Sequence, residues 1–105
     1  MSKHLVKKLS IAAGLVLVMN SSVYADGAAL YTSKGCAACH GADAKSPIMP
    51  AYPKIAGQSK KYLTQQMVDI KTGARSNGQS ATMKGIMAGI SDDEIAEIAV
   101  YISGL

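Results

Sequence analysis

The sequence predicts a small all-α protein with long loops. Two segments repeat apolar residues at spacings of three and four, and each begins at a serine placed to cap a helix. Stretches rich in glycine and proline separate the helical segments. No segment has the turn-bounded alternation that is typical of a strand pair or hairpin.

The first 25 residues have the composition of a secretory signal peptide. Three lysines come first, an almost wholly apolar run follows at 9–19, and the sequence VYA at 23–25 suits a signal peptidase. The apolar run is shorter than the roughly 20 residues that a membrane-spanning helix needs. We therefore predict export, cleavage after Ala25, and one domain at 26–105 with no stable membrane insertion.

Removal of the signal changes the charge of the protein. The full chain has a formal net charge of +4, with eleven basic and seven acidic residues. Three of the basic residues and none of the acidic ones lie in the first 25 residues, which leaves about +1. This balance gives no support for a nucleic-acid partner.

The remaining chain has few large side chains for a core. Residues 26–105 contain four tyrosines and neither phenylalanine nor tryptophan. A chain this short has difficulty burying enough apolar surface unaided. The two cysteines are three residues apart and cannot link distant parts of the fold. We therefore expect a large cofactor in the core.

The first half of the domain contains one predicted helix and one long loop. Residues 26–40 suit a helix in which Gly35 is a weak point. Residues 41–57 hold all three prolines and show no sustained periodicity, so they form a predicted loop.

The second half begins with a helix over 60–72, capped by Ser59 and ended by Gly73. A loop over 74–82 and about a turn of helix over 83–89 follow.

The last predicted helix has the clearest boundaries. Ser91 and Glu94 form a capping box, in which each side chain satisfies a backbone amide of the other residue. Gly104 ends the helix, and one apolar stripe runs along it: Ile95, Ile98, Ala99 and Ile102.

The run CAACH at 36–40 carries the strongest chemical signal. On a helix Cys36, Cys39 and His40 are at positions i, i+3 and i+4, so they share a face. Two thiols at this spacing can each add to a vinyl group of haem, and the histidine then reaches the iron. This is the pattern of covalent haem attachment.

Three other interpretations explain the run less well. Zinc needs at least three protein ligands, and residues 26–105 offer two cysteines and one histidine. A thiol–disulfide oxidoreductase places Cys-x-x-Cys after a strand, which this sequence lacks. A chance motif leaves the aromatic-poor core unexplained.

A methionine is the expected sixth iron ligand, because residues 26–105 contain no second histidine. Met49 is only nine residues from His40, and Met67 lies on an apolar helix stripe. Met83 and Met87 follow a polar loop and are four residues apart, so both can point inward. Periodicity does not choose between them.

Across residues 26–105 the chain resembles the small bacterial class I cytochromes c, above all periplasmic members with one haem that correspond to half of a dihaem relative. The likeness is carried by Gly27, Leu30-Tyr31, CAACHG at 36–41, YPKIAGQ at 52–58, Tyr62-Leu63, KTGAR at 71–75, residues 83–91 and Tyr101-Ile102. It implies three to four short helices and long loops wrapped around one covalent haem c.

The resemblance also implies roles for individual residues. In this family the methionine seven residues before the apolar residue of the last Leu/Ile-Ser pair ligates the iron, and here that residue is Met83. Relatives often carry proline or a second methionine just before the ligand, where this chain has Ala-Thr, so Met87 is its rival. The Pro53 carbonyl is expected to accept the His40 Nδ1–H, and Ile55 to pack on the haem.

The implied function is electron transport in the periplasm. With both axial positions filled, the iron has no place for a substrate, so we expect a carrier and not an enzyme. A redox donor and acceptor would dock transiently on a monomer, at the haem edge near Cys36 and Cys39. Two alternatives remain: a haem-based binder or sensor of small gases with a labile sixth ligand, and a fixed electron-transfer subunit of a larger oxidoreductase complex.

Overall fold

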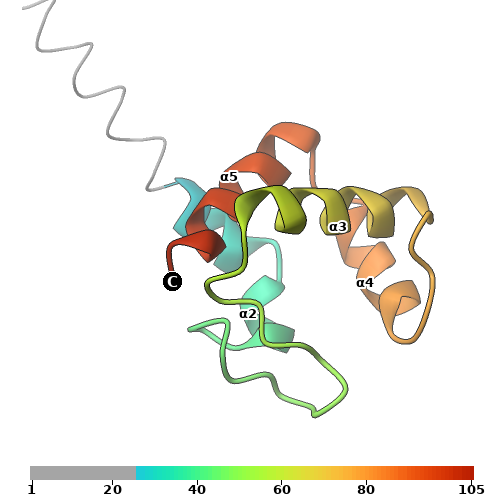
Figure 1. Ribbon diagram of the computed structural model, residues 1–105, viewed down its shortest axis with the longest axis horizontal. Helices are drawn as coiled ribbons and strands as arrows, with labels where there is room; N and C mark the ends of the chain where they lie inside the picture. Colours follow the sequence, from blue (N-terminus) through green and yellow to red (C-terminus); the bar gives the residue numbers. More distant parts are fainter. Residues whose placement is uncertain (1–25) are drawn as a thin grey trace, which may run out of the picture.

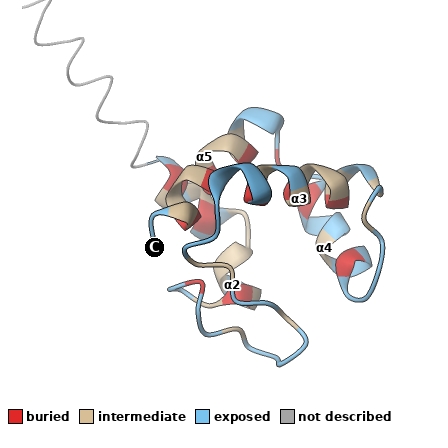
Figure 2. Ribbon diagram, in the orientation of Figure 1, coloured by how far each residue is buried: buried red, intermediate tan, exposed pale blue. Residues whose placement is uncertain are grey.

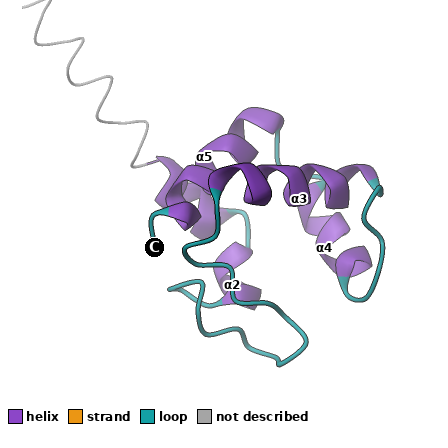
Figure 3. Cartoon of the chain, in the orientation of Figure 1, coloured by secondary structure: helices purple, strands orange, loops and turns teal. Residues whose placement is uncertain are grey.

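The computed structural model describes residues 26–105; the predicted signal segment lies outside the described residues. Residues 26–33 are helical and precede α2 (Cys36–His40), α3 (Lys60–Thr72), α4 (Ser80–Met87) and α5 (Asp92–Ser103) (Figure 1). Between 26 and 105 the rest is loop and no residue is in a strand, which confirms the all-α prediction (Figure 3). No helix in this range is both long and apolar enough to span a bilayer.

The predicted single helix over 26–40 is wrong, because the chain turns at Gly35. The Gly35 backbone has φ 87°, a left-handed conformation that interrupts a right-handed helix and that glycine adopts without steric cost. The first helix ends at residue 33, and α2 starts in a new direction at Cys36. Gly35 is thus the bend that sets the direction of α2.

The helix at 26–33 crosses α5 at close range. A Cβ atom on Gly27 would lie 2.7 Å from the Glu97 carbonyl oxygen, so only glycine allows this approach. The Tyr31 and Tyr101 rings pack with centroids 5.6 Å apart. Burial raises the pKa of Tyr31 to about 12, so its hydroxyl stays protonated and donates to the Gly41 carbonyl oxygen at 2.6 Å. These contacts tie the start of the domain to its end.

Helix α3 has the predicted boundaries. The Ser59 hydroxyl accepts a hydrogen bond from the Tyr62 amide at 3.2 Å, and the helix ends before Gly73. It packs against both α4 and α5. The side chains that it buries are those of the predicted stripe, Leu63, Met67 and Ile70 (Figure 2).

Helix α4 starts three residues earlier than predicted and has two turns, so the preceding loop is limited to 74–79. The Gln79 carbonyl accepts the amides of Thr82 and Met83 at 3.1 and 3.3 Å, which begins the helix. The start lacks a side-chain cap, so no residue type marks the boundary there. Ser80 thereby enters the helix one turn before Met83.

Helix α5 begins with the predicted capping box. The Ser91 hydroxyl accepts from the Glu94 amide at 3.2 Å, and the Glu94 carboxylate accepts from the Ser91 amide at 3.0 Å. These bonds, together with Lys34 at 3.4 Å, hold the pKa of Glu94 below its usual value. The buried face is the predicted stripe: Ile95, Ile98, Ala99 and Ile102.

The Ser91 cap allows a direct test of this helix. Ser91→Ala removes the acceptor for the Glu94 amide and should lower the free energy of unfolding by about 1 kcal/mol. Chemical denaturation of the holoprotein measures the change. Ser76→Ala, in an exposed loop, is the matched control and should change stability by less than about 0.5 kcal/mol. Equal effects of the two substitutions would contradict the cap's contribution.

Candidate haem-binding site

A cavity of about 450 Å³ lies between α2, α3 and α4 and the loop that precedes α3. This volume is within the roughly 300–1,000 Å³ that is typical of small-molecule sites. Apolar side chains of α3 and α5 line its inner wall, among them Leu63, Ile70, Ile98 and Ile102. The fold therefore encloses a mostly apolar space that its own side chains leave unfilled.

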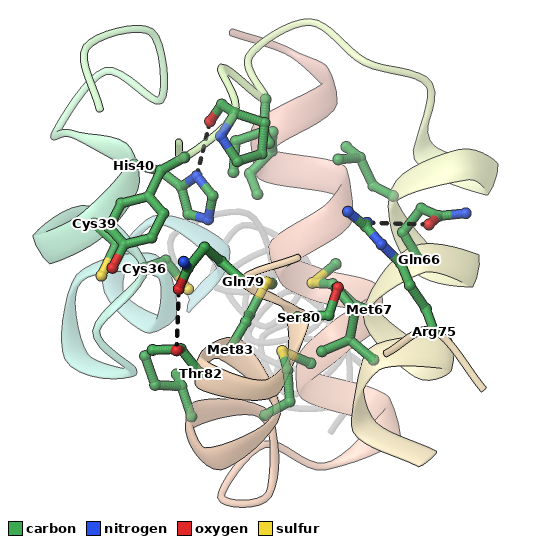
Figure 4. Close-up of a pocket in the computed structure, with 18 of the residues that line it drawn as sticks. Cys36, Cys39, His40, Gln66, Met67, Arg75, Gln79, Ser80, Thr82 and Met83 are labelled. Atoms are coloured by element: carbon green, nitrogen blue, oxygen red, sulfur yellow. Dashed lines mark hydrogen bonds between the residues drawn. The ribbon is translucent and has the colours of Figure 1, made fainter. Parts of the chain in front are cut away.

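The two thiols and the imidazole of α2 line this cavity together. Cys36 and Cys39 are half-buried and not in a disulfide, and His40 is buried (Figure 4). Burial raises the pKa of the Cys36 thiol, whereas redox-active thiols in Cys-x-x-Cys motifs have lowered pKa values. Residues 26–105 also contain no strand, whereas a thiol–disulfide oxidoreductase carries this motif beside a βαβ unit.

The His40 ring is held in one orientation. Its Nδ1 lies 2.9 Å from the Pro53 carbonyl oxygen. Because a carbonyl can only accept, Nδ1 carries the proton and donates, which leaves the Nε2 lone pair free for a metal. Ile55 lines the cavity beside this pair, and its amide donates to the Ala44 carbonyl at 2.9 Å. The loop thus places the Pro53 carbonyl at the His40 ring and Ile55 on the cavity wall.

Three methionines line the cavity: Met67, Met83 and Met87. Figure 4 shows Met83, from α4, facing His40 across the cavity. Met83 is half-buried, whereas Met87 is only 1% exposed and belongs to the core. Met49 is 44% exposed and is not part of the lining.

Several polar groups of the lining lie on α3, on α4 and in the loop between them, among them Gln66, Arg75 and Ser80. The Ser80 hydroxyl is buried without a hydrogen-bond partner within residues 26–105, which calls for a group that only a bound ligand or water supplies. Arg75 and Gln66 lie on the side of the cavity away from the cysteines (Figure 4). An apolar space with thiols at one end and a cation at the other fits haem, whose flat apolar ring carries acidic groups on one edge.

Sequence reasoning missed the contribution of Arg75, Gln66 and Ser80 to the lining. Arg75 is part of the KTGAR run, which carries the family resemblance but does not indicate a place at the cavity. Gln66 and Ser80 are polar residues of helices, and their residue type does not distinguish them from exposed ones. The one available signal was that Arg75 is the chain's single arginine and lies three residues after the end of α3.

A model of the family Cytochrome c matches residues 24–105. The chain belongs to the cytochrome c family. This membership confirms the haem interpretation: the protein carries covalently bound haem c, and Cys36, Cys39 and His40 fit the attachment sequence. When bound, haem supplies an iron that accepts or releases one electron.

Two curated relatives and one solved structure locate the chain within the family. Cytochrome c4 of Pseudomonas aeruginosa is 41% identical over 99 residues, which cover 91% of this chain and 47% of the relative. The thiosulfate dehydrogenase electron acceptor of Stutzerimonas stutzeri is 36% identical over 92% of this chain and 46% of its own length. Reduced recombinant cytochrome c4 from Pseudomonas stutzeri has a similar structure, with TM-score 0.70 and 28% identity over 81% of this chain and 49% of that one.

These comparisons confirm the predicted fold class and family. The chain spans about half the length of each of these relatives, as the resemblance to half of a dihaem protein predicted. The chain is therefore similar to one half of a cytochrome c4.

Covalent attachment has a direct test. Holoprotein that is denatured and extracted with acidified organic solvent should keep its colour in the protein fraction, because thioether bonds survive unfolding. Its mass should equal the chain from Asp26 plus one haem, and Cys39→Ala should still retain haem through Cys36. Extraction of the haem from the unmodified protein, or a mass that corresponds to zinc, would contradict the attachment.

Proposed function

We propose that the protein is a periplasmic one-electron carrier whose haem iron is ligated by His40 and Met83. The observation that carries the proposal is the thioether of Met83 on the opposite side of the cavity from the oriented His40 ring (Figure 4). With His40 and Met83 both bound to it, the iron would offer no open site for substrate or oxygen. The protein then transfers electrons and is not itself an enzyme.

Burial supports Met83 over Met87 as the ligand. Both side chains line the cavity, but Met87 is only 1% exposed and belongs to the core, whereas Met83 is half-buried. Methionine commonly fills gaps in a core, and Met87 fits that role. A soft thioether ligand also raises the reduction potential, which suits an electron acceptor.

The haem edge near Cys36 and Cys39 is the proposed docking site for redox partners. The amide of Ile48 donates to the Cys39 carbonyl at 3.1 Å, so the loop after α2 lies directly beside this edge. Ile48 and Met49 are 66% and 44% exposed there. A small apolar surface favours brief, weak encounters of a monomer with its partners.

The name of one relative suggests a class of donor. The similar protein of Stutzerimonas stutzeri is named as an electron acceptor of thiosulfate dehydrogenase. An exported dehydrogenase that oxidises an inorganic sulfur compound is therefore a reasonable first donor to assay, with this chain as acceptor.

Two methionine variants test the ligation. Met83→Ala should abolish the weak sulfur–iron absorption band of the oxidised protein, lower the reduction potential and allow the ferrous iron to bind carbon monoxide. Met87→Ala should keep the low-spin spectrum and lower the free energy of unfolding by roughly 2–5 kcal/mol, because it leaves a cavity in the core. Absorption spectra and carbon monoxide titration give the readout.

The opposite result, with the sulfur–iron band lost only in Met87→Ala, would show that Met87 is the ligand. Carbon monoxide binding by the unmodified protein at neutral pH would contradict the carrier proposal itself. A labile sixth position would then favour a gas binder or sensor.

A further inference from the structure

Two lysines from distant parts of the chain hold the turn between α4 and α5, residues 88–91. Lys71, near the end of α3, donates from Nζ to the Ile90 carbonyl oxygen at 2.6 Å. Lys34, just before α2, donates from Nζ to the Gly89 carbonyl oxygen at 3.2 Å. Because Gly89 and Ile90 are consecutive, the two cations bind adjacent carbonyl groups of one short turn.

Each lysine also forms an ion pair with an acid in the first turn of α5. Lys71 Nζ lies 3.6 Å from an Asp92 carboxylate oxygen, and Lys34 Nζ lies 3.4 Å from a Glu94 carboxylate oxygen. The Asp92 side chain is 86% exposed, and ion pairs in water contribute little. The bonds to the turn are different, because both lysine side chains are mostly buried and a charged donor strengthens a hydrogen bond. The contribution of Lys71 is therefore assigned to its bond with the Ile90 carbonyl.

Helix α4 has few other supports. Among α2 to α5 it packs against α3 alone (Figure 1), and its start has no side-chain cap. Its last residues continue by hydrogen bonds into the turn: the Gly89 amide donates to the Ile86 carbonyl at 3.3 Å, and the Ile90 amide donates to the Met87 carbonyl at 3.1 Å. A displacement of α4 therefore has to move the turn that the two lysines hold.

The turn is close to the expected sulfur ligand along the same helix. Met83 precedes Gly89 by six residues, which is less than two helical turns. We propose that Lys71, assisted by Lys34, is a positioning residue: it keeps α4 in place and thereby limits the rate at which the Met83 thioether leaves the iron. This rests on the iron ligation of the proposed function. A thioether that rarely leaves keeps the iron closed to outside ligands, as a carrier requires.

The binding of imidazole to ferric holoprotein measures this rate at neutral pH. Imidazole can take the sixth position only after the thioether has left, so at high imidazole concentration the binding rate reaches a plateau set by the departure of Met83. Lys71→Leu removes the donor to the Ile90 carbonyl, and the plateau rate should rise roughly tenfold. Lys71→Arg keeps a charged donor at this position and should restore most of the original rate.

Two control variants separate the turn from charge and from overall stability. Lys84 is exposed on α4 next to Met83 and belongs to neither ion pair of residues 26–105, so Lys84→Leu removes a charge without touching the turn. Ala99 is buried on α5 and does not line the cavity, so Ala99→Gly lowers the stability of the protein at a distance from the iron. Both controls should leave the plateau rate within about twofold of the original.

An unchanged plateau rate in Lys71→Leu would overturn the proposal. An equal rise in Ala99→Gly would also overturn it, because Lys71 would then act only through overall stability. Lys34→Gln weakens the bond to the Gly89 carbonyl and should raise the plateau by a smaller factor; if Lys71→Leu does not accumulate, an unchanged plateau in Lys34→Gln overturns the proposal. A rate in the unmodified protein that increases with imidazole and never reaches a plateau would instead overturn the Met83 ligation on which the proposal rests.

Discussion

Residues 26–105 include neither phenylalanine nor tryptophan, and their helices enclose an apolar cavity of about 450 Å³. A chain this small has little apolar surface to spare, so leaving such a space unfilled would cost much of its stability. Covalent haem c would fill this space with one large, flat, mostly apolar group. The cofactor would then form part of the hydrophobic core, with His40 and Met83 placed to hold its iron.

Three local features position the groups around the haem. The left-handed turn at Gly35 points the thiols and imidazole of α2 into the cavity. The Pro53 carbonyl then fixes the His40 ring through Nδ1, so that Nε2 is free for the iron. On the other side α3 packs against α4, which carries Met83 to the opposite wall. The turn at Gly35 is set by local backbone conformation, whereas the other two features depend on contacts between separate segments of the chain.

The sequence predicted the helices whose boundaries are set by neighbouring residues in the sequence. Ser59 and Ser91 can be recognised as helix caps from their residue type and position. The buried stripes of α3 and α5 follow from helical spacing. The early start of α4 was missed because an uncapped helix start leaves little trace in residue type. Gly35 was predicted as a weak point within one helix, and it is a complete break between two. The CAACH run predicted the cofactor, but the placement of Arg75 opposite the cysteines depends on the tertiary fold.

The central claim is that haem completes the core, and the folding of the haem-free chain tests it most directly. The Cys36→Ala/Cys39→Ala double variant, freed of haem, should be compared with holoprotein by far-ultraviolet circular dichroism during heating. The account predicts a cooperative, native-like thermal transition for the holoprotein and a largely unfolded spectrum without such a transition for the variant. A cooperative transition of the haem-free chain at ordinary temperatures would contradict it.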